Sequence, residues 1–347
     1  FFFLALAVTF SHPQSAQQPP SCVSPKMVDA GSEEEVLVQR IWEICDSIAK
    51  LASLKPSPEV NSLFSQLVLA CIPPSPIDVA KLSGEAQEMR SRLIRLCGEA
   101  EGLLESHYSS LLASHANPLD HLALFPYYSN YVKLGLLEYT ILREHARRPP
   151  ARVAFVGSGP LPLTSIMLAT HHLRTSCFHN YDVDPAANAM ALRLVGMDPD
   201  LSERMVFHTA DITEVTHDLR DYDVVFLAAL VGVCGEEKAT VVEHLARHMA
   251  PGAVLMLRSA HGARAFLYPV VDPYSLRGFE VLEVFHPADE VINSVVIARK
   301  PPACGDHPKE LGHGAVVLPC KCSELTAFSP LNHASIMEEL TVEEKVS

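Results

Sequence analysis

Two neighbouring stretches of the chain combine glycines and carboxylates in a pattern that could hold a nucleoside. The apolar run 152–156 leads into a turn that contains Gly157 and Gly159, and the next apolar run, 175–181, is followed by Asp182. Glycines let the backbone turn sharply and approach a ligand closely. An acid at the tip of the following strand can accept hydrogen bonds from both hydroxyls of a ribose. The pattern therefore predicts a nucleoside site on a sheet of parallel strands.

The residues of the turn narrow the choice of nucleoside. The turn reads Gly-Ser-Gly-Pro-Leu-Pro and lacks the third glycine of the dinucleotide fingerprint. Pro160 and Pro162 also remove two backbone N–H donors that a pyrophosphate would use. A ligand with a ribose but no phosphate fits better, and we expect S-adenosylmethionine. The simpler alternative is a strand-to-helix turn that binds nothing.

Two further turns should meet this one at the carboxyl edge of the sheet, where folds of this kind bind their ligands. Ala210 and Asp211 follow the third apolar run and would lie at the adenine edge, while Ala228 and Ala229 follow the fourth and would form the floor. Asp184 and Asp211 could equally cap the helices that follow them. The predicted binding residues are Gly157, Ser158, Gly159, Pro160, Asp182, Asp184, Ala210, Asp211, Ala228 and Ala229.

Length and composition argue against several other classes of protein. A chain of 347 residues suggests two domains, and a formal net charge of −14 provides no field that would attract a nucleic acid. The nine cysteines lie mostly in apolar patterns, which favours reduced thiols in a cytoplasmic protein. Cys320 and Cys322 are closer than the usual zinc spacing, so we expect no metal site. No segment reaches the length of about 18 apolar residues that would predict a membrane span.

The first half of the chain should be helical. From residue 27 to residue 150 the apolar residues recur at helical spacing, with Ser32, Ser57 and Ser83 as expected caps and a further helix from about Pro126. We expect this domain to cover the nucleoside site as a lid. The helix after Ser83 should bury the stripe Met89, Leu93, Leu96, Ala100, Leu104 and Leu111.

The pattern changes in residues 151–300, where short β-branched runs alternate with helical segments. This alternation predicts a sheet built from βαβ units. The last two runs have no spacer of helix length between them, so they should pair antiparallel. We expect residues 1–26 to be a leader outside the fold, with Met27 as the natural start, and residues 301–347 to be an irregular tail. The predicted strands lie at 152–156, 175–181, 204–208, 222–228, 252–258, 279–286 and 292–299.

A long and distinctive run occupies residues 117–134 and reads Asn-Pro-Leu-Asp-His-Leu-Ala-Leu-Phe-Pro-Tyr-Tyr-Ser-Asn-Tyr-Val-Lys-Leu. Together with residues 156–162, 181–184 and 226–232, it resembles plant nicotianamine synthases, and the resemblance extends from Met27 to Lys300. The resemblance implies an α/β fold in which a helical domain precedes a Rossmann-like, doubly wound sheet of seven strands, as in class I methyltransferases.

The resemblance also implies an activity. Enzymes of this family condense three molecules of S-adenosylmethionine into nicotianamine and release three molecules of methylthioadenosine. Nicotianamine chelates iron, zinc and copper in plants and is a precursor of phytosiderophores. We therefore expect an enzyme that needs no cofactor beyond its substrate S-adenosylmethionine.

The catalytic residues are likewise implied by the resemblance. The glutamate and tyrosine pair of the archaeal members falls on Glu105 and Tyr131, the first to deprotonate the attacking ammonium and the second to position it. Helical periodicity alone does not select Glu105, because about 100° per residue places it off the stripe of Leu104 and Leu111, as a solvated glutamate would be. Glu138 lies on the stripe of Tyr131 and is the reserve candidate for the base.

Two other functions fit the same residues. One is an ordinary small-molecule methyltransferase with a helical acceptor domain, and the other is a catalytically silent protein that binds S-adenosylmethionine. The spent ligand separates the three functions: methylthioadenosine for the synthase, adenosylhomocysteine for the methyltransferase and an unconsumed ligand for the binder.

Overall fold

The computed structural model describes residues 32–75 and 77–302 and the backbone of residues 320–321. The expected leader, residues 1–26, and nearly all of the expected tail lie outside the described residues. Short 3-10 or π-helical segments carry the label η. The N-terminal helices are α1 (Glu33–Ile48), α2 (Pro58–Cys71), η1 (Val79–Lys81), α3 (Gly84–Leu112), η2 (Pro118–Leu124) and α4 (Tyr128–His145).

Side-chain caps fix the starts of the first three α-helices, as predicted. The hydroxyls of Ser32, Ser57 and Ser83 each accept a hydrogen bond from the backbone N–H three residues further on. Ser32 and Glu35 form a complete capping box. These bonds satisfy N–H groups that have no partner inside the helix.

Helix α4 begins two residues later than predicted. Phe125 precedes a proline and adopts an extended conformation, with φ −70° and ψ 126°. A residue before proline is disfavoured in the helical region, so η2 ends there. The chain then turns through Pro126 and Tyr127, and α4 starts at Tyr128.

All seven predicted strands are present, within two residues of the predicted bounds. They form one sheet in the order β3-β2-β1-β4-β5-β7-β6, parallel except for β7, which runs antiparallel to both neighbours as expected. A two-residue strand, β8 (Cys320–Lys321), pairs in parallel with β6 and lies in the tail that the sequence predicted to be irregular. Two residues give no periodic pattern, which is why β8 was not predicted. The other strands are β1 (Arg152–Val156), β2 (Cys177–Asp182), β3 (Met205–Thr209), β4 (Val224–Leu227), β5 (Val254–Ser259), β6 (Glu280–Phe285) and β7 (Ser294–Arg299).

Helices cover both faces of the sheet, so alternate residues of its central strand enter two different cores. Val153 and Phe155 belong to the core that includes residues of α4, α5 and α6. Ala154 and Val156 belong to the core that includes residues of α8. The remaining helices are α5 (Leu163–Met167), η3 (Leu168–His172), α6 (Pro185–Val195), α7 (Pro199–Arg204), η4 (Ile212–Glu214), η5 (Asp218–Asp221), α8 (Gly235–His248), η6 (Gly262–Phe266) and η7 (Pro273–Ser275).

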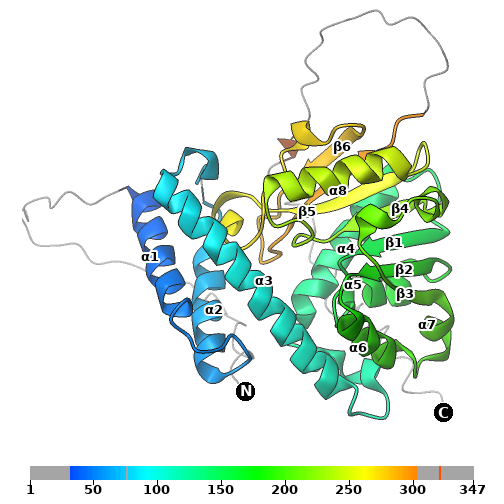
Figure 1. The fold of residues 1–347 in the computed structure, drawn as a ribbon, viewed down its shortest axis with the longest axis horizontal. Coiled ribbons are helices and arrows are strands. Elements are labelled where there is room, and N and C mark those ends of the chain that lie inside the picture. The colour runs from blue at the N-terminus through cyan, green and yellow to red at the C-terminus, as the bar shows by residue number, and fades with distance from the viewer. Residues whose placement is uncertain (1–31, 76, 303–319, 322–347) are drawn as a thin grey trace, which may run out of the picture.

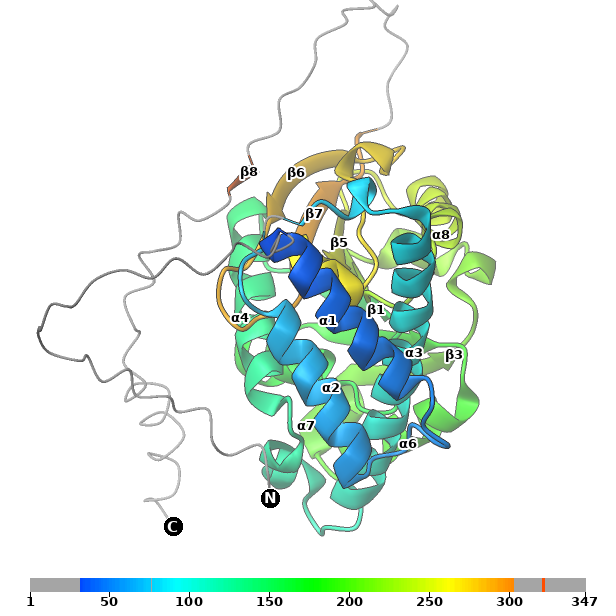
Figure 2. The same cartoon turned by 90° about the vertical axis from the view of Figure 1, so that its left-hand side faces the viewer.

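The helices α1 and α2 stand on the side of the molecule away from the sheet, and α3 extends from them toward it (Figure 1). Figure 2, seen from that side, shows α1 and α2 in front of the sheet. The segment η6 joins the two parts, because Ala263 and Phe266 pack in the core that contains Ile41 of α1. Arg264 donates a hydrogen bond to the carbonyl of Ile72 at 2.9 Å.

The buried stripe of α3 follows the prediction at one end only. Met89, Leu93 and Ala100 are buried as expected, but Leu111 is 40% exposed and Leu112 is fully buried in its place. The reason is a change of neighbours along the helix. The first half of α3 shares a core with α1 and α2, whereas Leu112 joins the core on the sheet.

The sequence also led to predictions about membrane spans and about the cysteines. Among the described residues, no helix is both long and apolar enough to cross a membrane. Cys45, Cys71 and Cys97 are free and buried, as expected of core thiols, while Cys234 is free but exposed. The side chains of Cys320 and Cys322 lie outside the described part.

Candidate active site

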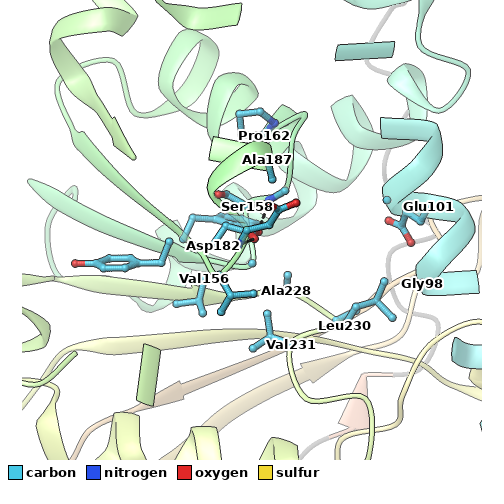
Figure 3. A pocket seen from close by; sticks show the side chains of 18 of the residues that line it. Gly98, Glu101, Val156, Ser158, Pro162, Asp182, Ala187, Ala228, Leu230 and Val231 are labelled. Atoms are coloured by element: carbon cyan, nitrogen blue, oxygen red, sulfur yellow. Dashed lines mark hydrogen bonds between the residues drawn. The ribbon is translucent and has the colours of Figure 1, made fainter. Parts of the chain in front are cut away.

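A cavity of about 890 Å³ lies at the carboxyl ends of β1 to β4. The turns that follow these strands form one wall, and residues of α3 form the wall opposite. In Figure 3, Gly98 and Glu101 of α3 lie across the cavity from Ser158 and Asp182. The residues predicted from sequence that line the cavity are Glu105, Tyr131, Gly157, Ser158, Gly159, Pro160, Asp182, Asp184, Ala210, Asp211, Ala228 and Ala229.

The glycine turn requires glycine for two independent reasons. Gly157 and Gly159 have φ of +78° and +65°, a region that residues with a Cβ rarely adopt. A Cβ at position 159 would also lie 2.7 Å from Oε2 of Glu105. The turn after β1 therefore approaches α3 closely, and the helical part of the chain contributes a carboxylate directly over the predicted nucleoside site.

Asp182 is held in place by the turn that it faces. Its Oδ2 accepts a hydrogen bond from the N–H of Gly159 at 2.8 Å, and its Oδ1 accepts one from the N–H of Asp184 at 3.0 Å. Each carboxylate oxygen has more than one acceptor position, so both can still bind a hydroxyl. This geometry is suited to a pair of ribose hydroxyls.

Asp184 and Asp211 cap helices and also line the cavity. The Oδ1 of Asp184 accepts from the N–H of Ala186 at 2.8 Å, and the Oδ1 of Asp211 accepts from the N–H of Thr213 at 2.9 Å. Backbone and side-chain hydrogen bonds from Thr213 lower the pKa of Asp211. The capping role and the binding role of these residues are thus compatible, since a capping carboxylate can keep an oxygen free.

Glu105 and Tyr131 meet in the cavity. The hydroxyl of Tyr131 lies 3.3 Å from Oε1 of Glu105. Removal from bulk water raises the pKa of Glu105 well above its ordinary value, and the neighbouring carboxylate of Glu101 raises it further. Burial likewise raises the pKa of Tyr131, so its hydroxyl keeps its proton and remains a donor.

Glu138, the reserve candidate for the base, does not face the cavity as a base would have to. It is 1% exposed and forms a two-pronged ion pair with Arg258, with Nε–Oε1 at 2.7 Å and Nη2–Oε2 at 3.0 Å. Among the described residues it is not part of the cavity wall. Both oxygens of Glu138 are engaged by Arg258 and the residue lies outside the cavity wall, so this geometry does not support Glu138 as the base.

The residues that were not predicted include Glu101, Arg258 and Tyr268, which line the cavity, and Lys238, which supports its floor. Glu101 alone had a sequence signal, because it lies four residues before Glu105 and thus on the same side of α3. Lys238 is 6% exposed and donates to the carbonyl oxygens of Ala228 at 3.2 Å and Ala229 at 2.9 Å, which fixes the floor. Burial lowers the pKa of Lys238 to about 8.

One group of potential metal ligands occurs among the described residues, away from the cavity. Glu144, His145 and Glu283 place one donor atom each within 4.8 Å of one another. His145 Nε2 lies 2.8 Å from Oε2 of Glu283, a distance that an ordinary histidine–glutamate hydrogen bond explains. The expectation of no metal site stays a prediction.

Comparisons with known proteins point to one family. A family model described as "Nicotianamine synthase protein" matches residues 30–305. Nicotianamine synthase of Solanum lycopersicum is 60% identical over 310 residues, which cover 89% of this chain and 98% of that protein. Nicotianamine synthase 3 of Oryza sativa subsp. japonica is 59% identical over 323 residues, which cover 89% and 94%.

A solved structure supports the fold. The crystal structure of MtNAS in complex with MTA and tNA matches with a TM-score of 0.65 and 22% sequence identity, covering 79% of this chain and 100% of that one. The match includes both the helical part and the sheet, since it spans most of the described residues. From the family model and the plant relatives, the chain is a member of the nicotianamine synthase family.

Proposed function

We propose that this chain condenses three molecules of S-adenosylmethionine into nicotianamine, with release of three molecules of S-methyl-5′-thioadenosine. Family membership supports the reaction. The observation that carries the proposal is the position of Glu105, whose Oε2 lies 2.7 Å from where a Cβ on Gly159 would be. A proton acceptor from the helical part thus faces the strand-end turn that would hold the donor molecule.

The proposed binding mode follows from the two walls of the cavity. The ribose of the donor would bind Asp182, and its adenine would lie beside Ala210 and Asp211. The sulfonium would sit near the glycine turn, with the aminocarboxypropyl chain directed toward α3. A methyltransferase must expose the sulfonium methyl group, whereas this orientation exposes the methylene carbon to an amine that enters along α3.

Each transfer forms one carbon–nitrogen bond and breaks one carbon–sulfur bond. The α-ammonium of the acceptor gives a proton to Glu105, and the free amine attacks the methylene carbon next to the sulfonium. The electron pair of the broken bond stays on sulfur, which leaves as the neutral thioether of methylthioadenosine. Two such transfers join three molecules, and an intramolecular attack closes the azetidine ring.

Glu105 suits this role because its surroundings make it a stronger base than an exposed glutamate. A raised pKa brings the proton affinity of a carboxylate closer to that of the amine it must deprotonate. We assign Tyr131 to position the amine, since its hydroxyl lies 3.3 Å from Oε1 of Glu105.

We propose that the reaction requires no metal or other cofactor, because a sulfonium already carries a good leaving group. We also propose a cytoplasmic location, which the free thiols of Cys45, Cys71 and Cys97 favour. The net charge of −14 argues against nucleic-acid partners.

The identity of the spent ligand tests the proposal. Purified protein given S-adenosylmethionine as its sole substrate should release methylthioadenosine and accumulate nicotianamine, as measured by liquid chromatography and mass spectrometry. Dependence on a second substrate with adenosylhomocysteine as the coproduct would establish a methyltransferase instead. An unconsumed ligand would establish a silent binder.

A further inference from the structure

Glutamates of helix α3 line the cavity at positions 99, 101 and 105, and the proposed mechanism uses only Glu105. Glu101 and Glu105 are four residues apart, so they lie on the same side of the helix, and both line the cavity. The hydroxyl of Tyr131 lies between them, 3.4 Å from Oε1 of Glu101 and 3.3 Å from Oε1 of Glu105. Figure 3 shows Glu101 directed from α3 toward the turns at the strand ends.

A second tyrosine fixes the other oxygen of Glu101. The hydroxyl of Tyr268 donates to Oε2 at 2.9 Å. Burial raises the pKa of Tyr268 well above its ordinary value, so this hydroxyl stays a donor. Both oxygens of Glu101 are therefore oriented by hydroxyl groups, yet each retains an acceptor position for a ligand.

No basic side chain of the described residues is ion-paired with either Glu101 or Glu105, although the charge of Arg258 acts on both. Within residues 32–75 and 77–302, the ion pairs of the structure involve neither Glu101 nor Glu105. Arg258 is the guanidinium that lines the cavity, and its Nε and Nη2 are bonded to Glu138 and Thr164. Two neighbouring carboxylates that are partly buried and have no ion-pair partner are costly, and a cationic ligand would relieve that cost.

The proposed reaction brings two cations into this space, the sulfonium of the donor and the α-ammonium of the acceptor. We infer that Glu101 is a second catalytic carboxylate, which binds the acceptor ammonium beside Glu105 and stays ionised while Glu105 takes the proton. This inference rests on the proposed function.

The different roles of Glu101 and Glu105 follow from the three N–H groups of the acceptor ammonium. A primary ammonium has three N–H groups, and the transfer removes one of them. When Glu105 accepts that proton, the remaining two N–H groups need acceptors that keep the lone pair aimed at the methylene carbon. Oε1 of Glu101 and the oxygen of Tyr131 are placed to accept them. After the carbon–nitrogen bond forms, the product amine is again a cation, and ionised Glu101 balances its charge.

Glu101→Gln tests the inference because it keeps the size of the side chain and removes its charge. We expect kcat/KM for methylthioadenosine release to fall about 10- to 100-fold, the equivalent of losing one hydrogen bond to a charged group. The coproduct should remain methylthioadenosine. Glu88→Gln is the matched control, since Glu88 is an exposed glutamate of the same helix and should keep wild-type kinetics.

The pH profile distinguishes a catalytic role from a structural one. The groups that face Glu105 are Glu101 on its own helix, Tyr131 of α4, Asp182 of β2 and Arg258 of β5. The negative charge of Glu101 raises the pKa of Glu105, and the reaction needs Glu105 ionised. Removing that charge should therefore move the acid limb of kcat/KM to lower pH in Glu101→Gln. An unmoved limb with wild-type kcat/KM would overturn the inference.

If Glu101→Gln does not fold, a second variant tests the role of Glu101. Tyr268→Phe leaves Glu101 charged but releases one of its oxygens, so we expect a smaller loss of kcat/KM with normal thermal stability. Wild-type kinetics in Tyr268→Phe would then overturn the inference. Failure of the proposed function is a separate result, because it appears as absence of methylthioadenosine from reactions of the wild-type protein.

Discussion

At the scale of single residues, Gly159 links the two halves of the site. Its φ is +65°, and a Cβ on it would lie 2.7 Å from Oε2 of Glu105, which leaves no space for a side chain. We expect Gly159→Ala to abolish most methylthioadenosine release, because the added carbon would displace either the turn or the carboxylate. A coupled assay of methylthioadenosine measures this directly.

Gly252→Ala is the matched control for that substitution. Gly252 has φ +87°, but a Cβ there would meet nothing within 4 Å. Both substitutions should cost about 1–2 kcal/mol of unfolding free energy from the backbone alone. Only Gly159→Ala should lose turnover. Equal turnover in the two variants would show that the close approach of Gly159 to Glu105 is not needed for activity.

The raised pKa of Glu105 has a consequence for stability. The folded protein binds the proton of Glu105 more tightly than the unfolded chain does, so stability is present below the unfolded pKa and is lost as pH rises through the folded pKa. Glu105→Gln removes this dependence. We expect the Tm of the variant relative to wild type to increase as pH rises above 4.5, the ordinary pKa of a glutamate, measured by scanning calorimetry; a difference that stays constant with pH would contradict the raised pKa.

Sequence patterns located the strand-end turns that form one wall of the cavity, but they did not locate the whole of its lining. The glycine turn and Asp182 were predictable because strand ends meet at one edge of a parallel sheet. Glu101, by contrast, was missed because periodicity detects apolar faces, whereas a cavity-facing side of a helix is polar. Tyr268 and Arg258 reach the site through long-range folding and have no local signal.

At the scale of elements, α3 shows what periodicity can and cannot predict. The strands lay within two residues of their predicted bounds because central strands covered on both faces are short, continuous apolar runs that polar or turn residues delimit. The stripe of α3 was wrong at Leu111 because the helix changes neighbours along its length. We expect Leu112→Ala to cost about 2–5 kcal/mol of unfolding free energy and Leu111→Ala much less, by chemical denaturation. Equal costs would contradict the exchange of buried positions.

At the scale of the whole molecule, the two parts of the chain share core residues in two places. η6 carries Phe266 into the core of the N-terminal helices, and α4 contributes Leu134 to a core on the sheet. The sequence predicted a helical domain and a sheet domain, but it could not predict this exchange of core residues, since the contacts join segments far apart in the chain. The exchange holds α3 at a fixed position over the strand ends, where its carboxylates face the ligand.

The central claim is that a carboxylate from the helical part acts on a substrate held by the sheet, and Glu105→Gln tests it most directly. The variant keeps the size and hydrogen bonding of the side chain but not its basicity. Methylthioadenosine release should fall about 10²- to 10⁴-fold, the range for loss of a general base, while calorimetry shows S-adenosylmethionine affinity close to that of wild type. Wild-type turnover in Glu105→Gln would contradict the claim.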